Sequence, residues 1–332
     1  MIQSFAYQKP REIAQAFELM QQGSVPLAGG TDLIPLLKYE VRSPATLADI
    51  TLLPQLKGIE QREDTLWIGA TETLEDIQRH PLVTQHFPAL AFAAKCVASP
   101  QIRAVGTLGG NILQDRRCIY FNQSYSWRSS LDLCFKTGGI VCHQAPASPS
   151  CRAIYYSDVA TALYALDANV HLYTQEGLQT LTVAQLCEEH ALRNGTTGQK
   201  FPLVTGFSIP IPSLPLGQGM VNRFVKQSVR QSIDFPTFNA ALSAQIGEET
   251  LQVRLAVGAI REYPVLLSET ARMIEEMGRA DFDLEAVETA ALVEIAKWGK
   301  PVQEASISVK TKRASYQGIK PLLETLSQAL AQ

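Results

Sequence analysis

Apolar and polar positions follow helical and strand periods from the start of the chain. Over residues 10–22 the apolar side chains recur at the i, i+3, i+4, i+7 spacing of an amphipathic helix. A short strand is expected at residues 26–28, a helix at 33–38 and a second strand at 45–50. These elements predict a small β-α-β unit that ends near residue 55.

A second unit begins near residue 66. Its pattern predicts strands at residues 66–70, 170–173 and 207–211, with helices at 74–78 and 89–97. Residues 210–217 are dense in proline and glycine, which indicates a boundary. Beyond it, strands at 223–227, 240–246 and 252–257 precede helices at 267–277, 284–296 and 314–331. The order of elements predicts an α+β fold in three segments, 1–55, 56–217 and 218–332.

The composition is that of an ordinary globular protein. Of 332 residues, 46% are apolar and 18% are charged, which is enough for a sizeable core. The net charge of −3 gives no electrostatic reason to expect a nucleic acid or a membrane surface as partner. There is no run of 18 apolar residues and no signal-peptide pattern, so we expect a cytoplasmic protein. Thiols stay reduced in that compartment, so the six cysteines favour metal or redox chemistry over disulfides.

Two glycine loops are the first candidate site. The first places Gly29 and Gly30 between a predicted strand and a helix, where glycine permits a positive φ and close approach of a ligand. The second contains Gly109 and Gly110 and adds the hydroxyl of Thr107 and further backbone N–H groups. Two such loops could cradle one pyrophosphate, and for either loop alone plain turn chemistry is the alternative. Neither loop reads G-x-G-x-x-G, so a Rossmann dinucleotide fold is not supported.

Several segments, in order, resemble the FAD-binding subunit of the molybdenum hydroxylase family. That family includes xanthine dehydrogenases, carbon monoxide dehydrogenases and 4-hydroxybenzoyl-CoA reductases. The segments are AGGTDL at 28–33, QIRAVGTLGGN at 101–111 and SDVATAL at 157–163, followed by FSIP at 207–210, FVK at 224–226 and VGA at 257–259. The resemblance implies a two-part FAD-binding region of the vanillyl-alcohol-oxidase/CO-dehydrogenase-flavoprotein type over 1–55 and 56–217. An α+β C-terminal domain, 218–332, would then cover the flavin.

The resemblance also implies roles for individual residues, by matching position. Asp158 would bind the ribityl or ribose hydroxyls, and Lys226 would lie close to the isoalloxazine, with an ordinary surface charge as the alternative for each. Val204 would pack near the flavin or adenine ring, and Val97 would line the cavity. Gly29, Gly30, Thr31 and Asp32 would meet the pyrophosphate, helped by Thr107, Gly109 and Gly110. Asn111 would close the second loop, and the other cofactor-binding residues of the first loop would be Leu27, Ala28 and Leu33.

Four cysteines, Cys118, Cys134, Cys142 and Cys151, lie between the second glycine loop and residues 157–163. Their C-x15-C-x7-C-x8-C spacing matches neither the paired knuckles of zinc ribbons nor the tight run of small ferredoxins. Four thiolates is nevertheless the number that an iron–sulfur cluster needs, and a structural zinc site is the alternative. The other two cysteines, at 96 and 187, are expected to be small buried apolar residues.

These four cysteines belong to an insertion over residues 112–156, where most members of the family have a short turn. Its aromatic residues favour an ordered segment. The insertion resembles that of the β subunit of 4-hydroxybenzoyl-CoA reductases, which implies a [4Fe–4S] cluster on the four cysteines. His143 could replace a ligand or hydrogen-bond a sulfur, or lie near the surface. The positive charge near the thiols comes from Arg116, Arg117, Arg128, Lys136 and Arg152.

The resemblance implies an electron-transfer flavoprotein subunit that is active only in a complex. The partners would be a molybdenum-cofactor catalytic subunit, a small [2Fe–2S] subunit, and ferredoxin or another redox partner. The first expectation is inward electron flow for reductive dehydroxylation of 4-hydroxybenzoyl-CoA or a related aromatic thioester. The alternatives are outward flow from an aldehyde or N-heterocycle to NAD⁺ or another acceptor, and a stand-alone flavin or metal sensor or scaffold. No catalytic residue is predicted, because the five histidines are dispersed without a nucleophile–base signature.

Overall fold

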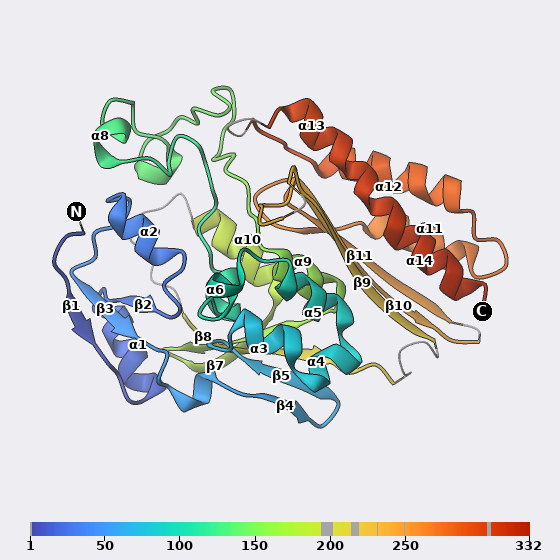
Figure 1. Ribbon diagram of the computed structural model, residues 1–332, viewed down its shortest axis with the longest axis horizontal. Coiled ribbons are helices and arrows are strands. Elements are labelled where there is room, and N and C mark those ends of the chain that lie inside the picture. Colours follow the sequence, from blue (N-terminus) through green and yellow to red (C-terminus); the bar gives the residue numbers. More distant parts are fainter. Residues whose placement is uncertain (1, 194–201, 214–218, 231, 249, 304–306) are drawn as a thin grey trace.

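The computed structural model describes residues 2–193, 202–213, 219–230, 232–248, 250–303 and 307–332. Three sheets follow one another along the molecule, each with its own helices (Figure 1). This mixture of helices and separate sheets confirms the predicted α+β class. The predicted boundary at 210–217 falls partly on residues 214–217, which lie outside the described residues.

The first sheet is parallel and has the order β1-β3-β2. Its strands are β1 (Ala6–Gln8), β2 (Val25–Leu27) and β3 (Thr46–Asp49), and α1 (Ile13–Gln21) and α2 (Leu33–Lys38) connect them. The apolar stripe predicted for the first helix is the buried face of α1, formed by Ala16, Phe17 and Met20. The β2–α2 connection carries the first glycine loop.

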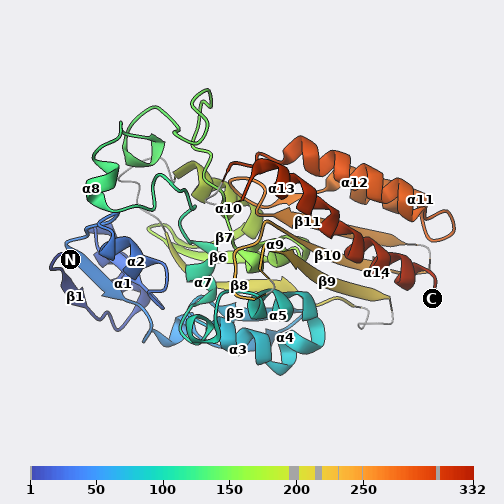
Figure 2. The same ribbon diagram turned by 45° about the horizontal axis from the view of Figure 1, so that its top comes forward.

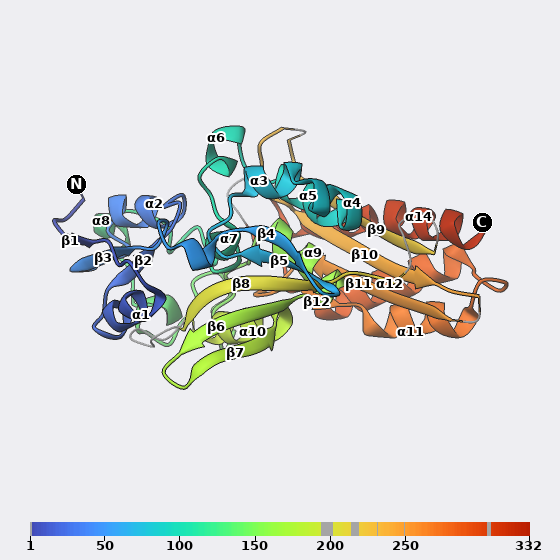
Figure 3. The same cartoon turned by 90° about the horizontal axis from the view of Figure 1, so that it is seen from below.

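The second sheet is antiparallel and has the order β4-β5-β8-β6-β7. Figure 3 shows it beside the first sheet, with α3, α4 and α5 above β4 and β5. The strands are β4 (Ile59–Arg62), β5 (Thr65–Gly69), β6 (Asn169–Thr174), β7 (Gly177–Thr182) and β8 (Leu203–Pro210). The helices are α3 (Leu74–Arg79), α4 (Pro81–His86), α5 (Pro88–Lys95), α6 (Pro100–Arg103), α7 (Leu108–Ile112), α9 (Asp158–Ala165) and α10 (Val183–Arg193), and η1 (Pro54–Leu56) leads into the sheet.

The third sheet is antiparallel, in the order β12-β11-β10-β9, and packs between two layers. On β10 the period of two sends Phe238, Ala240 and Leu242 into the C-terminal core, and Ala241 into the core shared with α9. The strands are β9 (Met220–Gln227), β10 (Phe238–Ile246), β11 (Leu251–Gly258) and β12 (Val265–Leu266). The helices are α11 (Ser268–Met277), α12 (Leu284–Trp298), α13 (Val309–Ala314) and α14 (Lys320–Leu330), with η3 (Ser315–Ile319) before α14.

The expected single helix over 314–331 is wrong at its start. A 3-10 turn, η3, occupies residues 315–319, and α14 begins at Lys320 with Pro321 in its first turn. Proline has no N–H to donate to a carbonyl four residues back, so it fits the first turn of a helix and interrupts the hydrogen-bond ladder of a helix that would run through it.

The insertion contributes only α8 (Tyr125–Arg128) and η2 (Phe135–Thr137) as regular structure. Figure 2 shows it alongside the first sheet and α10. The Arg128 guanidinium donates to the carbonyls of Tyr39 (3.2 Å) and Glu40 (2.8 Å), which ties the insertion to the β-α-β unit. At its ends, Arg117 N–H donates to the carbonyl of Ile154 (3.0 Å). Across the described ranges, no helix is both long and apolar enough to cross a bilayer.

Candidate functional site

The two glycine loops line one cavity of about 500 Å³, which we call the glycine-loop cavity. This volume lies within the range typical of small-molecule and cofactor sites. Of the predicted site residues, ten line it: Ala28, Gly29, Gly30, Thr31, Asp32 and Leu33 from the first loop, Thr107, Gly109 and Gly110 from the second, and Val204 from β8. The cavity therefore brings together the two loops and the start of β8.

Close contact between the two loops requires glycine. A Cβ on Gly29 would lie 1.8 Å from the carbonyl oxygen of Val105, closer than any real contact. Gly30 has φ of +71°, a conformation that L side chains rarely adopt. Gly30 thus has the predicted positive φ, whereas the close approach at Gly29 is to the backbone of the second loop; the predicted approach of a ligand stays a prediction.

The loops differ in the backbone donors that they leave available. In the second loop, Gly109 N–H donates to the carbonyl of Ala70 (2.9 Å), and Gly110 N–H donates to the capping hydroxyl of Thr107 (3.2 Å). Within the described part of the chain, no protein acceptor takes the N–H groups of Gly30 and Thr31. The expectation that both loops offer free N–H groups therefore holds only for the first loop. The second loop forms part of the cavity wall.

A charged network closes the cavity on the side of the insertion. Asp115 and Asp32 both line the cavity, and Asp115 N–H donates to the Asp32 carboxylate (3.1 Å). The Arg117 guanidinium donates to the other oxygen of Asp32 (3.0 Å), and Arg42 lies 3.8 Å from the Asp115 carboxylate. The first glycine loop is thus held by the residues that precede Cys118.

Asp115 is itself paired with a buried cation. The Lys136 amino group donates to its carboxylate at 2.5 Å, and the two side chains are 3% and 6% exposed. Burial acts to raise the pKa of Asp115, but the Lys136 ammonium and then Arg42 outweigh it, and the pKa lies below the usual value. Burial lowers the pKa of Lys136, and the Asp115 carboxylate opposes that shift, so the charged state of each group depends on the presence of the other.

His190 also lines the cavity, from α10. Burial lowers its pKa to about 4, partly opposed by the Asp115 carboxylate. The imidazole is therefore neutral at pH 7 in the protein without ligand.

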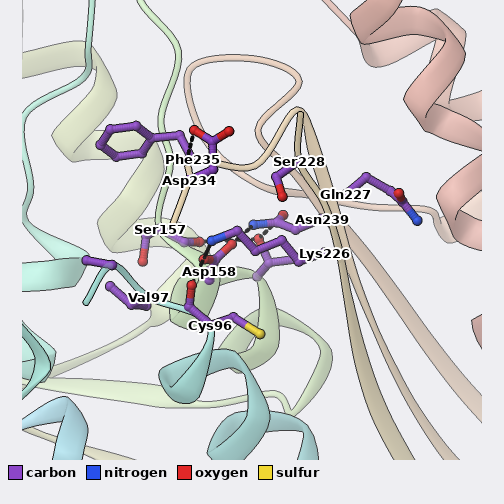
Figure 4. Close-up of polar contacts among 12 residues, drawn as sticks. Cys96, Val97, Ser157, Asp158, Lys226, Gln227, Ser228, Asp234, Phe235 and Asn239 are labelled. Carbon is purple, nitrogen blue, oxygen red and sulfur yellow. Dashed lines mark hydrogen bonds and ion pairs between the residues drawn. The ribbon is translucent and has the colours of Figure 1, made fainter. Parts of the chain in front are cut away.

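Three further predicted residues, Val97, Asp158 and Lys226, lie together at the contact of α9 with the third sheet (Figure 4). The Lys226 amino group donates to the Asp158 carboxylate (2.7 Å) and to the carbonyl of Cys96 (2.8 Å). Asn239 donates to the other Asp158 oxygen at 2.6 Å. The pair is buried, with Asp158 3% and Lys226 10% exposed, so the alternative that they are surface charges is wrong. Val97 follows the carbonyl that Lys226 binds.

Asn111 connects this cluster to the second glycine loop. Its side-chain oxygen accepts a hydrogen bond from the Ser157 hydroxyl (2.6 Å), and the same hydroxyl caps α9 through Ala160 N–H. Asn111 and Leu27 are not among the residues that line the glycine-loop cavity, and neither are Val97, Asp158 and Lys226.

The four predicted metal ligands, Cys118, Cys134, Cys142 and Cys151, line one narrow pocket, which we call the cysteine pocket. Phe121, Lys136 and His143 line it as well. Its cavity volume is only about 10 Å³, so its walls would have to part to admit a cluster. Among the described residues, no three His, Cys, Asp or Glu side chains form the close group that a single metal ion needs. That finding favours neither zinc nor a cluster, and the donor set, four soft thiols on one pocket, fits an iron–sulfur group by its chemistry alone.

The two remaining cysteines behave as predicted. Cys187 is 3% exposed in the core of the second unit, and Cys96 packs at the edge of that core. Burial raises the pKa of Cys96 to about 11 and that of Cys187 to about 12, so both thiols stay protonated at neutral pH.

Sequence reasoning missed Arg42, Asp115 and His190 as cavity residues. The triplet Asp115-Arg116-Arg117, directly after the second loop, was the available signal, because three charges beside a glycine loop are unlike the apolar residues around them. His190 and Arg42 carry no sequence motif and reach the cavity only through the packing of α10 and the turn after α2.

Comparison with known proteins fits this geometry. The family described as "FAD binding domain in molybdopterin dehydrogenase" matches residues 3–212. The FAD-binding subunit of aldehyde oxidoreductase from Escherichia coli is 29% identical over 294 residues, 85% of this chain and 89% of that one. The carbon monoxide dehydrogenase medium chain of Hydrogenophaga pseudoflava is 40% identical over 111 residues, 32% of this chain and 39% of that one.

Solved structures share the fold over the full length. A carbon monoxide dehydrogenase chain from Hydrogenophaga pseudoflava superposes with a TM-score of 0.75 at 20% identity, covering 99% of each chain. Quinoline 2-oxidoreductase from Pseudomonas putida 86 gives 0.74 at 18% identity over the whole of both chains. These likenesses show the fold.

The chain belongs to the family of FAD-binding domains in molybdopterin dehydrogenases. The predicted resemblance to flavin subunits of molybdenum hydroxylases is confirmed at that level, and so is FAD as the cofactor.

Proposed function

We propose that this chain is the electron-transfer flavin subunit of a molybdenum-containing complex and holds two redox groups, FAD and a [4Fe–4S] cluster. The single observation that carries the second group is the cysteine pocket, where residues far apart in the insertion supply four thiols to one place. FAD, when bound, accepts two electrons and releases them singly, which suits a subunit between a two-electron reaction and one-electron carriers.

In this proposal the glycine-loop cavity holds the pyrophosphate of FAD. Gly29, Gly30, Thr31 and Asp32 would meet it, because free backbone N–H groups suit an anion and the two glycines allow close approach. Thr107, Gly109 and Gly110 would form the opposite wall, with Leu27, Ala28, Leu33 and Asn111 shaping the two loops, and Val204 would contact a ring.

The flavin ring would extend toward the Lys226–Asp158 cluster. Asn111 and Ser157 join that cluster to the cavity wall by hydrogen bonds, which supports one continuous site. Asp158, held by Lys226 and Asn239, would orient a ribityl or ribose hydroxyl, and Lys226 would hold a cation near the ring. Val97 would line the ring side, and the third sheet would exclude water.

The proposed partners are a molybdenum-cofactor subunit, a small [2Fe–2S] subunit and ferredoxin or another redox partner. The insertion with its cysteine pocket favours inward electron flow for reductive dehydroxylation of 4-hydroxybenzoyl-CoA or a related aromatic thioester. Outward flow, from an aldehyde or N-heterocycle to NAD⁺ or another acceptor, is the second candidate, and the aldehyde oxidoreductase relative favours it. A cytoplasmic location stays a prediction.

Iron, sulfide and flavin analysis of the anaerobically purified chain tests the proposal. We expect about four irons and one FAD per chain, with an EPR signal of a reduced [4Fe–4S] cluster. Cys142→Ser should lose the iron and keep FAD, and Cys187→Ala, the matched control in the core, should keep both. Zinc in place of iron, or FAD with no metal, would remove the cluster from the proposal.

A further inference from the structure

Lys136 places a buried cation on the wall of the cysteine pocket. Its side chain is 3% exposed and lines the pocket together with the four cysteines. The amino group donates to the carbonyl of Arg116 (2.7 Å) and lies 4.0 Å from the centre of the Phe121 ring. A charge this deep needs a partner, since an isolated buried ammonium is costly.

That partner belongs to the other cavity. Asp115, which accepts from Lys136 at 2.5 Å, lines the glycine-loop cavity and joins the first glycine loop through its N–H bond to Asp32. One ion pair therefore has its cation on one pocket and its anion on the other.

We infer that the Lys136–Asp115 ion pair is an electrostatic link between the two redox sites. The inference rests on the proposed function, because it takes an anionic cluster on the four thiolates and an anionic pyrophosphate beside the glycine loops. Lys136 stabilises the more negative, reduced state of the group that the cysteines hold. Asp115 balances Lys136 and moderates the affinity of the cavity for a diphosphate.

The link makes opposite predictions for its two members. Removing the cation leaves Asp115 to repel the pyrophosphate and the cluster, so flavin binding weakens and the cluster potential falls. Removing the carboxylate charge leaves Lys136 in excess, so flavin binding strengthens and the cluster potential rises. If Lys136 and Asp115 only filled space, the two single variants would shift the FAD affinity in the same direction as each other, and likewise the cluster potential.

The experiment uses the full chain at pH 8 as wild type, Lys136→Met, Asp115→Asn and the double variant. Lys310→Met, an exposed lysine on α13, is the matched control for the loss of one positive charge. The dissociation constant for FAD is measured by flavin fluorescence on iron-free protein, and the cluster midpoint potential by EPR-monitored titration of loaded protein. We expect FAD binding to be roughly tenfold weaker in Lys136→Met and tighter in Asp115→Asn. One uncompensated charge beside the cavity wall changes the binding free energy of an anion by about the amount that corresponds to a tenfold change in the dissociation constant.

In the double variant, both quantities should return close to the wild-type values, because neither buried charge remains. Equal or same-direction shifts in the two single variants would overturn the link, as would a shift in Lys310→Met equal to that in Lys136→Met. If the wild-type chain takes up no iron, the cluster in the proposed function fails and the link to it is overturned, while the FAD titration on iron-free protein still tests the effect of the ion pair on the glycine-loop cavity.

Discussion

Gly29 and Val105 are in backbone contact, so close that a Cβ on Gly29 would lie 1.8 Å from the Val105 carbonyl oxygen. This contact makes one wall out of two loops that lie far apart in the sequence. The shape of the glycine-loop cavity therefore depends on the absence of a single methyl group.

The substitution Gly29→Ala should open this contact. The Val105 carbonyl belongs to the backbone and cannot rotate away as a side chain would, so the loops must separate. We expect FAD affinity to fall at least about tenfold, measured by fluorescence titration. Gly247→Ala is the control, because its Cβ would come closest to the hydroxyl of the Thr250 side chain, at 2.6 Å, and Gly247 does not line the cavity. Unchanged affinity in Gly29→Ala would mean that the loops do not jointly bind the flavin.

The Lys226–Asp158 pair should stabilise the junction of the second and third sheets. In Lys226→Met the Asp158 carboxylate stays buried without its cation, and such a loss costs about 3–5 kcal/mol of unfolding free energy. The double variant Lys226→Met/Asp158→Asn removes both charges and should be less destabilised. Urea denaturation measures both.

Lys297→Met is the control for this series, because Lys297 forms an exposed pair with Glu269 and should give no measurable change. If the double variant is as unstable as Lys226→Met alone, the cost arises from packing and not from the unpaired carboxylate.

His190 should make the flavin-free protein acid-sensitive. Its pKa is about 4 when folded and near the ordinary 6.5 when unfolded, so the unfolded chain binds the proton first. Stability from this residue is complete above pH 6.5 and is lost as the pH falls from 6.5 to 4, by about 3 kcal/mol in all. His190→Gln should flatten the pH dependence in that window, measured by urea denaturation at several pH values. Parallel pH profiles for the variant and the wild type would refute this assignment.

Local patterns predicted most of the elements near the site. The α2 helix falls at the predicted residues 33–38, since its apolar periodicity and the preceding glycines both lie within a few positions. Short edge strands such as β1 and β7 were missed, because their side chains are largely exposed or half-buried and give no clear alternation.

Site residues could be predicted from the sequence where they belong to a recognisable local motif. They could not be predicted where packing brings distant segments together. Both glycine loops and all four cysteines could be singled out in the sequence, and each set lines one pocket. The ion pairs Lys136–Asp115 and Lys226–Asp158 could not be predicted from the sequence, because each pair joins segments that come into contact only in the folded protein.

The rate of flavin reduction by reduced ferredoxin tests the proposed inward electron flow most directly. The loaded chain is mixed with reduced ferredoxin in an anaerobic stopped-flow instrument, and the flavin absorbance is followed in wild type and in a Cys142→Ser variant that retains FAD. An inward electron-transfer subunit predicts fast reduction in the wild type and reduction slowed by more than about tenfold in the variant, because the cluster would be the entry point. Equal rates in the two proteins would contradict electron entry through the cluster.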